Sequence, residues 1–179
     1  MKPRQFIGLA LLGLLLGAGA GLTYKWWQAR QAELALPSSG QLPDFTLDNI
    51  DGTPWRSEEW RDRVLVINFW ATWCPPCRRE MPLLVRLSEE FGPRGVLFVG
   101  IAIDDPEKVR NFIDTHGIEF PILLGQEKGI QLAHQLGDLV EGLPYTVVAD
   151  RRGRIVMQRM GEVTETALRP LLERLTAGH

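Results

Sequence analysis

The apolar residues of this chain fall into short runs separated by polar, glycine-rich or proline-rich segments. Two runs, residues 64–70 and 96–103, are apolar almost throughout, which is typical of strands covered on both faces. Shorter β-prone segments lie at residues 120–124, 145–149 and 154–160, and the last of these alternates in character. The pattern predicts a sheet whose longest strands are buried on both sides.

Helical segments are predicted between these strands, and several of them end at a glycine. Pro106 suits the first position of one helix, and Gly117 suits its end. Strands that alternate with helices, followed by a hairpin near the C-terminus, indicate a three-layer α/β domain with a mixed sheet. The predicted helices cover residues 78–91, 106–116, 126–136 and 164–175.

A β-hairpin is predicted ahead of the first long strand. Residues 44–57 contain two short β-prone segments, and Asp51-Gly52 between them supplies a turn. Ser57 is expected to cap a short helical turn that runs to Trp60, because a serine hydroxyl can accept from a free N–H at a helix start.

The N-terminus is predicted to be a membrane anchor. A short basic start precedes an uncharged stretch of 17 residues, 6–22, which as a helix spans roughly 25 Å, or roughly 33 Å if it extends to Trp27. Tyr24, Trp26 and Trp27 resemble an interfacial aromatic belt, and the basic start favours the cytoplasmic side. We therefore expect residues 1–27 to cross the cytoplasmic (inner) membrane once, with the remainder facing the periplasm or the cell exterior.

A cleaved signal peptide is the alternative, because Ala18-Gly19-Ala20 has the small-x-small form that signal peptidases favour. Residues 28–41 are mostly small or polar and predict a linker, and residues 42–179 form the predicted domain. Either reading places the domain in a compartment where disulfides can form.

The charge distribution excludes nucleic acid as a partner. The net charge is -2, the basic excess belongs to the N-terminal segment, and no basic stripe crosses the domain. The sequence also has no glycine-rich phosphate loop, so we expect no nucleotide cofactor.

The two cysteines of the chain, Cys74 and Cys77, stand between the first long strand and the helix after it. Residues three apart share one helical face, about 5–6 Å apart, which a disulfide can bridge. With Cys74 at the N-cap, the positive end of the helix dipole favours its thiolate. Cys74, at the exposed tip, is expected to be the attacking nucleophile, and Cys77 is expected to resolve the mixed disulfide.

Three other interpretations of this cysteine pair have less support in the sequence. A zinc site needs two more ligands, and no histidine stands at ligand spacing from the cysteines. A purely structural disulfide gains little from so short a loop. A copper chaperone is typically richer in methionine or histidine near its thiols, where only Met81 is close. The dithiol is therefore expected to be its own redox centre, without a metal or other cofactor.

The stretch of residues 68–82, NFWATWCPPCRREMP, resembles the TlpA/ResA group of membrane-anchored, thioredoxin-like thiol–disulfide proteins. The resemblance extends over roughly residues 42–176. It implies a thioredoxin fold with an N-terminal β-hairpin and a central strand–helix insertion, preceded by one transmembrane helix. It also implies thiol–disulfide oxidoreductase activity outside the cytoplasm.

Several site residues follow from the same resemblance. Pro144 matches the family's cis-proline, which should place the backbone of Leu143 beside the two sulfurs, where a substrate strand can pair with it. Glu80 matches an acidic residue that, if buried, has a raised pKa and exchanges protons with the dithiol. Asn68 replaces the buried aspartate of cytosolic thioredoxins. Trp73 should shield the site and contact partners.

The resemblance favours a reductase of cysteine-containing proteins, with the haem-binding cysteines of apocytochrome c as one candidate substrate. A transmembrane electron donor of the DsbD/CcdA type would then recharge the dithiol. A thiol oxidant or isomerase, and a non-catalytic factor for copper delivery or assembly, stay open as alternatives. A peroxidase is disfavoured, because Thr72 stands two rather than three residues before Cys74.

Overall fold

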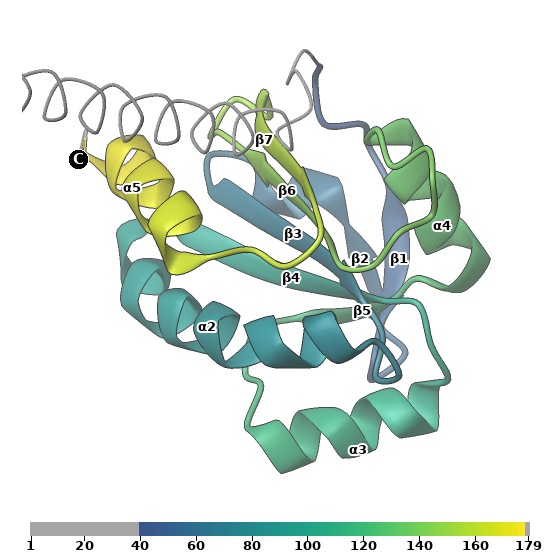
Figure 1. Ribbon diagram of the computed structural model, residues 1–179. Coiled ribbons are helices and arrows are strands. Elements are labelled where there is room, and N and C mark those ends of the chain that lie inside the picture. The colour runs from purple at the N-terminus through teal and green to yellow at the C-terminus, as the bar shows by residue number, and fades with distance from the viewer. Residues whose placement is uncertain (1–39, 178–179) are drawn as a thin grey trace, which may run out of the picture. The chain divides into compact units, whose positions relative to one another are not determined.

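The computed structural model describes residues 40–177, which contain a sheet of seven strands in the order β2-β1-β5-β4-β3-β6-β7 (Figure 1). The central strands β3, β4 and β5 run parallel, and the outer pairings are antiparallel, so the sheet is mixed as predicted. The strands are β1 (Thr46–Asn49), β2 (Pro54–Arg56), β3 (Val64–Trp70), β4 (Val96–Ala102), β5 (Ile122–Leu124), β6 (Tyr145–Ala149) and β7 (Ile155–Met160).

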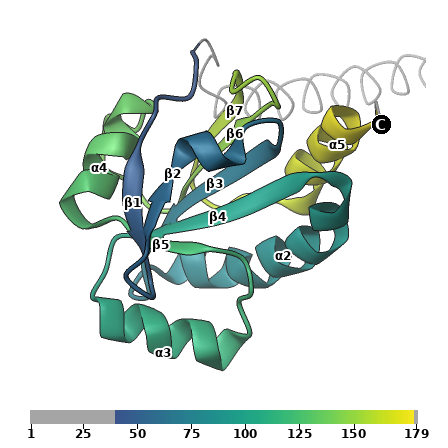
Figure 2. The same ribbon diagram turned by 180° about the vertical axis from the view of Figure 1, so that it is seen from behind.

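Helices cover both faces of this sheet, which makes the three layers that the sequence predicts (Figures 1 and 2). On one face, α2, α3 and α5 pack with Val66 and Trp70 of β3. On the other face, α4 and the short 3-10 helix η1 pack with Leu65, Ile67 and Phe69. The helices are η1 (Ser57–Trp60), α2 (Pro75–Phe91), η2 (Gly92–Arg94), α3 (Pro106–His116), α4 (Gln126–Gln135) and α5 (Glu165–Thr176).

The strand β3 is buried along its whole length, as its uninterrupted apolar sequence predicts. Successive side chains of a strand point to opposite faces, so a strand between two helical layers needs apolar residues at every position. β3 ends at Trp70, and α2 begins at Pro75, so the cysteines lie at the edge of the sheet where the parallel strands end. The burial of β3 thus fixes the position of the cysteine pair that follows it.

Most local signals are confirmed. The hairpin of β1 and β2 forms with Gly52 at a φ of 86°, and the strand and helix predicted over residues 120–124 and 126–136 form as β5 and α4. Asp105 caps α3, and Gly117 ends it with a φ of 61°. The expectation for Ser57 was wrong: Arg56 holds the N-cap position of η1, and the Ser57 hydroxyl accepts instead from the N–H of Phe45.

The predicted anchor, residues 1–27, and all but the last two residues of the predicted linker, 28–41, lie outside the described residues. Within residues 40–177, no helix combines the length and the apolar character needed to cross a bilayer. The described chain starts beside β7, where the N–H of Ile155 donates to the carbonyl of Gly40.

Candidate active site

Cys74 and Cys77 form a disulfide across the first turn of α2, with their Cα atoms 5.3 Å apart. Cys74 is the N-cap residue, and its Sγ accepts a hydrogen bond from the N–H of Cys77 at 3.2 Å. Pro75 and Pro76 occupy the first two helical positions and have no N–H to donate. The N–H of Cys77 is therefore the first backbone donor that α2 can offer to the sulfur of Cys74.

The exposed position expected for Cys74 is wrong. In the disulfide form, Cys74 is 3 % exposed and Cys77 is 0 % exposed, and both belong to the hydrophobic core on the α2 side of the sheet. The reason is local packing, since Trp70 and Ala71, four and three residues before Cys74, belong to the same core. Cys74 keeps slightly more access to solvent than Cys77, and burial shields the pair from indiscriminate reaction.

A carboxylate from the neighbouring strand anchors the loop before the cysteines. Asp104, just beyond β4, accepts hydrogen bonds from the N–H of Thr72 at 2.9 Å and from its hydroxyl at 2.5 Å. Partial burial raises the pKa of Asp104, but these bonds and one from the N–H of Asp105 outweigh it and hold the pKa below its usual value. The ionised carboxylate thus ties the end of β4 to the turn that presents Cys74.

Of the three residues predicted to bind substrate, Trp73 belongs to this turn and Leu143 lies near it. Trp73 is 64 % exposed, and Leu143 packs against the core that contains both cysteines. The peptide bond between Leu143 and Pro144 is cis, as the resemblance implies. Trp73 and Leu143 also line one small cavity together.

Glu80 lies one helical turn beyond Cys77 and is buried, with 1 % of its surface exposed. One of its carboxylate oxygens accepts from Nδ2 of Asn68 at 2.8 Å, and the other accepts from the N–H of Val163 at 2.7 Å. Glu80 is therefore not a solvated surface residue, and the neighbouring Arg79 pairs with Glu162. Glu80 instead links α2 to β3 and to the segment before α5.

Burial raises the pKa of Glu80 from an ordinary 4.5 to about 7. The hydrogen bonds from Val163 and Asn68 pull the pKa down, and the neighbouring charge of Glu162 adds to the rise, but loss of solvation dominates. A carboxyl group that titrates near neutral pH can take up or release a proton under physiological conditions. This agrees with the raised pKa predicted for a buried acid at this position.

Asn68 joins Glu80 to β6, the strand that follows the cis-proline. Its Nδ2 also donates to Oγ1 of Thr146 at 2.9 Å, across the pairing of β3 with β6. Among the described residues, no hydrogen-bond partner is found for its Oδ1. The sequence did not single out Thr146 or Val163, because Val163 is 83 positions from Glu80 and acts through its backbone.

We expect Asn68→Leu to raise the pKa of Glu80 by about one unit. The leucine removes a hydrogen bond to a charged group, and such a bond is worth about 1.5–3 kcal/mol, against roughly 1.4 kcal/mol for one pKa unit. The measurement is a ¹³C NMR titration of the Glu80 carboxyl carbon in the oxidised protein. Thr146→Val is the matched control, because it keeps the donor to Glu80; an unchanged or lower pKa in Asn68→Leu would contradict the assignment.

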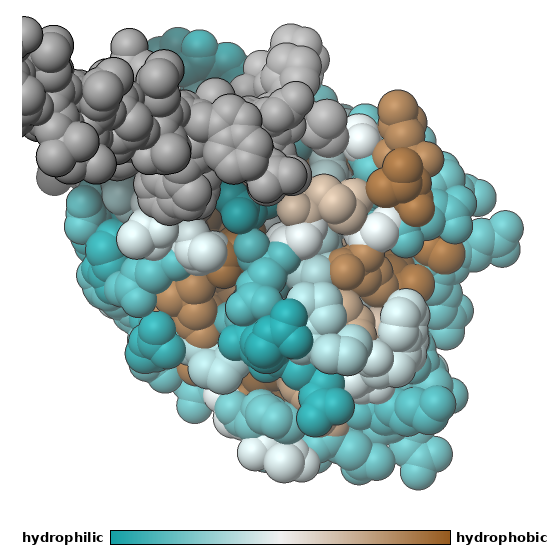
Figure 3. Space-filling model, viewed as in Figure 1, coloured by the Kyte–Doolittle hydropathy of each residue, from teal (hydrophilic) through white to brown (hydrophobic). Residues whose placement is uncertain are grey.

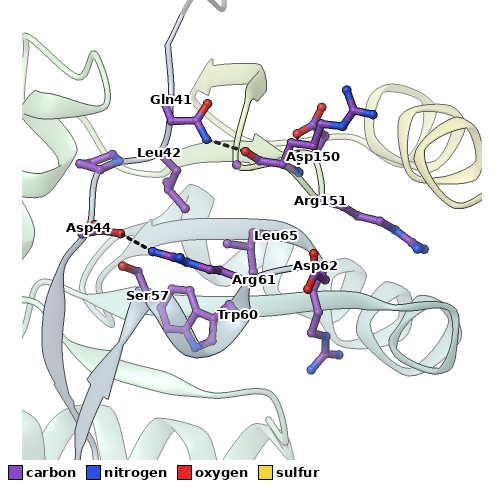
Figure 4. Close-up of a pocket in the computed structure, with 14 residues that line it drawn as sticks. Gln41, Leu42, Asp44, Ser57, Trp60, Arg61, Asp62, Leu65, Asp150 and Arg151 are labelled. Carbon is purple, nitrogen blue, oxygen red and sulfur yellow. Dashed lines mark hydrogen bonds and ion pairs between the residues drawn. The ribbon is translucent and has the colours of Figure 1, made fainter.

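A larger cavity of about 420 Å³ lies away from the cysteines (Figure 4). It includes Leu65 near the start of β3 and the turn at Asp150, whereas the cysteines follow the end of β3. Its charged side chains pair locally, as Asp44 does with Arg61 at 3.9 Å and Asp150 with Arg154 at 2.7 Å. Within residues 40–177, no three His, Cys, Asp or Glu side chains are grouped to hold a metal ion.

Comparison with known proteins agrees with this site. The AhpC/TSA family matches residues 39–158. The thiol-disulfide oxidoreductase ResA of Halalkalibacterium halodurans is 30 % identical over 174 residues, which cover 96 % of this chain and 95 % of that protein. The thioredoxin-like protein YneN of Bacillus subtilis is 32 % identical over 174 residues, which cover 95 % of this chain and 98 % of that protein.

Solved structures show the same architecture. A thiol:disulfide interchange protein of the thioredoxin family from Chlorobium tepidum superposes with a TM-score of 0.70 and 28 % identity, covering 79 % of this chain and 98 % of that one. A secreted thiol-disulfide isomerase from Corynebacterium glutamicum superposes with a TM-score of 0.71 at 23 % identity, covering 80 % of this chain and 92 % of that one. The described domain therefore has a thioredoxin-like fold.

Proposed function

Since this chain belongs to the AhpC/TSA family and is a thiol–disulfide oxidoreductase of the TlpA/ResA-like kind, we propose that it reduces disulfides of partner proteins outside the cytoplasm. The observation that carries the proposal is the Cys74–Cys77 disulfide at the start of α2, with the N–H of Cys77 directed at the sulfur of Cys74. The pair can hold two electrons without a metal or nucleotide.

The first step is attack by the Cys74 thiolate on a substrate disulfide. The helix dipole and the N–H of Cys77 favour the negative charge on this sulfur. A bond forms between Cys74 and one substrate sulfur, the substrate S–S bond breaks, and the other substrate sulfur leaves as a thiolate that takes up a proton. Leu143, beside the cis-proline, supplies backbone for pairing with the substrate strand.

The second step returns the substrate as a dithiol. Cys77 loses its proton and attacks the sulfur of Cys74, which releases the second substrate thiolate and leaves the Cys74–Cys77 disulfide. In this proposal Glu80, one turn away, accepts the proton of Cys77; its pKa of about 7, which lets either form exist near neutral pH, supports that role. Two electrons have then passed from the protein to its substrate.

Continued turnover requires a new pair of electrons. In an oxidising compartment, a transmembrane donor of the DsbD/CcdA type is the proposed source, and apocytochrome c cysteines are one candidate substrate. The anchor predicted for residues 1–27 would hold the domain at the outer face of the cytoplasmic membrane. The similarity to ResA over 96 % of this chain supports this assignment.

The reduction potential of the Cys74–Cys77 pair tests the direction of transfer. We expect a value at or below about -230 mV for the full-length protein equilibrated with glutathione or dithiothreitol buffers, as in reductases that depend on a dedicated donor. A value near -120 to -150 mV would instead support the thiol oxidant or isomerase. Tight one-to-one copper binding by the reduced pair, without disulfide turnover, would support the delivery factor.

A further inference from the structure

A small apolar cavity adjoins the redox site on the α4 side of the sheet. Its volume is about 200 Å³, and it shares Trp73 and Leu143 with the site described above. Phe69 of β3 and Ile130 of α4 contribute apolar walls, and two acidic residues, Asp138 and Glu141, also line the cavity. Glu80 is not among the residues that line it, so the cavity is separate from the proton-handling side of the site. Its lining is Phe69, Trp73, Ile103, Ile130, Ala133, Asp138, Glu141 and Leu143.

Strongly exposed large apolar side chains gather around this cavity. Within residues 40–177 they are Trp73, Leu139 and Val140, which are 64 %, 84 % and 75 % exposed. Trp73 lines the cavity, and the other two lie between Asp138 and Glu141, which also line it. Hydrophobic surface is visible on this side, over α4 and the loop that follows it (Figure 3). Apolar surface of this kind beside a reactive group is typical of an interaction site.

Hydrogen bonds and an ion pair hold the loop that contains Leu139 and Val140. Asp138 is 2 % exposed, and its carboxylate accepts hydrogen bonds from the N–H groups of Val140 and Gly142, both at 3.2 Å. Glu141 pairs with His134 of α4 at 3.1 Å. These contacts hold the backbone on both sides of the two apolar residues, so their exposure is a defined feature of the fold.

We propose that this cavity receives an apolar side chain that lies within two residues of the target cysteine in the substrate protein, and that Leu139 and Val140, beside the cavity, contact the same substrate chain. The inference rests on the proposed function, because the covalent bond to Cys74 is what brings the substrate chain here. Trp73 directly precedes Cys74, so a chain bonded to that sulfur passes the mouth of the cavity. The site is thus continuous with the surface that the substrate must touch.

The chemistry of the lining selects the occupant. The apolar walls match a leucine-sized or phenylalanine-sized group, and transfer of such a group from water into an apolar pocket is favourable. Asp138 and Glu141 disfavour an acidic neighbour, because like charges repel and the pocket cannot solvate another carboxylate. The expected preference is therefore leucine over serine, and serine over aspartate.

The test uses synthetic peptides with one cysteine held as a mixed disulfide with glutathione. A leucine, serine or aspartate is placed in turn at each of the two positions before and after the cysteine. The pre-reduced full-length protein, in excess over each peptide, reduces it in a single turnover, and the second-order rate constant is measured. We expect leucine to exceed serine about tenfold at one position or more, the range in which an apolar pocket discriminates.

Two variants locate that preference. The first is Leu139→Ser combined with Val140→Ser, which changes two exposed side chains, and the second is Ala133→Leu, which fills the cavity from α4. In either variant, the rate constants for the leucine and serine peptides should lie within about twofold of each other. Their rates with the serine peptide and their reduction potentials should stay unchanged. Val156→Ser, at a half-buried position of β7 that does not line the cavity, controls for the loss of an apolar side chain elsewhere and should keep the preference.

The outcomes separate this inference from the function on which it rests. Equal rates for the leucine and serine peptides at all four positions would overturn the pocket assignment, and so would an undiminished preference in the double serine variant. Failure to reduce any of the peptides, while the Cys74–Cys77 disulfide still forms, would instead count against the proposed reductase.

Discussion

Cys77→Ser is expected to turn this oxidoreductase into a covalent trap. Cys74 can still attack a substrate disulfide, but no thiol is left one turn further along α2 to release the product. Turnover should stop after at most one event per chain, and mixed disulfides through Cys74 should accumulate. Non-reducing electrophoresis and mass spectrometry of the protein incubated with disulfide-containing substrate would measure both effects.

Cys74→Ser is the matched control for this trap. Its remaining cysteine is 0 % exposed, so a mixed disulfide through Cys77 should form poorly or not at all. Equal trapping by the two variants would show that the two sulfurs do not have distinct roles. Turnover by Cys77→Ser at a rate near that of the natural protein would contradict the resolving role of Cys77.

Glu80→Gln should change how the stability of the oxidised protein depends on pH. The pKa of Glu80 is about 7 in the folded state, against 4.5 ordinarily, so the unfolded chain releases this proton at lower pH than the folded one. The stability contribution of neutral Glu80 is therefore complete below about pH 4.5, declines as pH rises to about 7, and is lost above that. The total change is about 3 kcal/mol, taking roughly 1.4 kcal/mol for each unit of pKa shift.

Urea denaturation of both proteins from pH 4 to pH 8 would measure this change. The free energy of unfolding of Glu80→Gln, relative to that of the natural protein, should rise by about 3 kcal/mol across this interval, since glutamine has no charge to bury. Glu89→Gln, at an exposed position of the same helix, is the control for loss of one carboxylate. A difference between Glu80→Gln and the natural protein that is constant with pH would show that Glu80 ionises as readily in the fold as in the unfolded chain.

Local signals were enough to predict the order of elements. The uninterrupted apolar run at 64–70, the proline at the start of α3 and the glycine at its end each act through neighbours close in the chain. The spacing of Cys74 and Cys77 determined the disulfide in the same way, because three residues across a first helical turn bring two sulfurs into reach. The resemblance to a known family predicted two further features, the cis bond before Pro144 and the buried carboxyl group of Glu80.

Three features of the site depend on contacts between distant segments, and only the tertiary structure decided them. Glu80 titrates near neutral pH because three segments enclose it, and one of its two hydrogen-bond donors is a backbone N–H 83 residues away. Cys74 is buried rather than exposed, since the core on the α2 side closes around it. The cavity beside Trp73 needs β3, α4 and the loop at Asp138 together. Sequence patterns report periodicity and local chemistry, whereas burial and long-range hydrogen bonds exist only after the chain has folded.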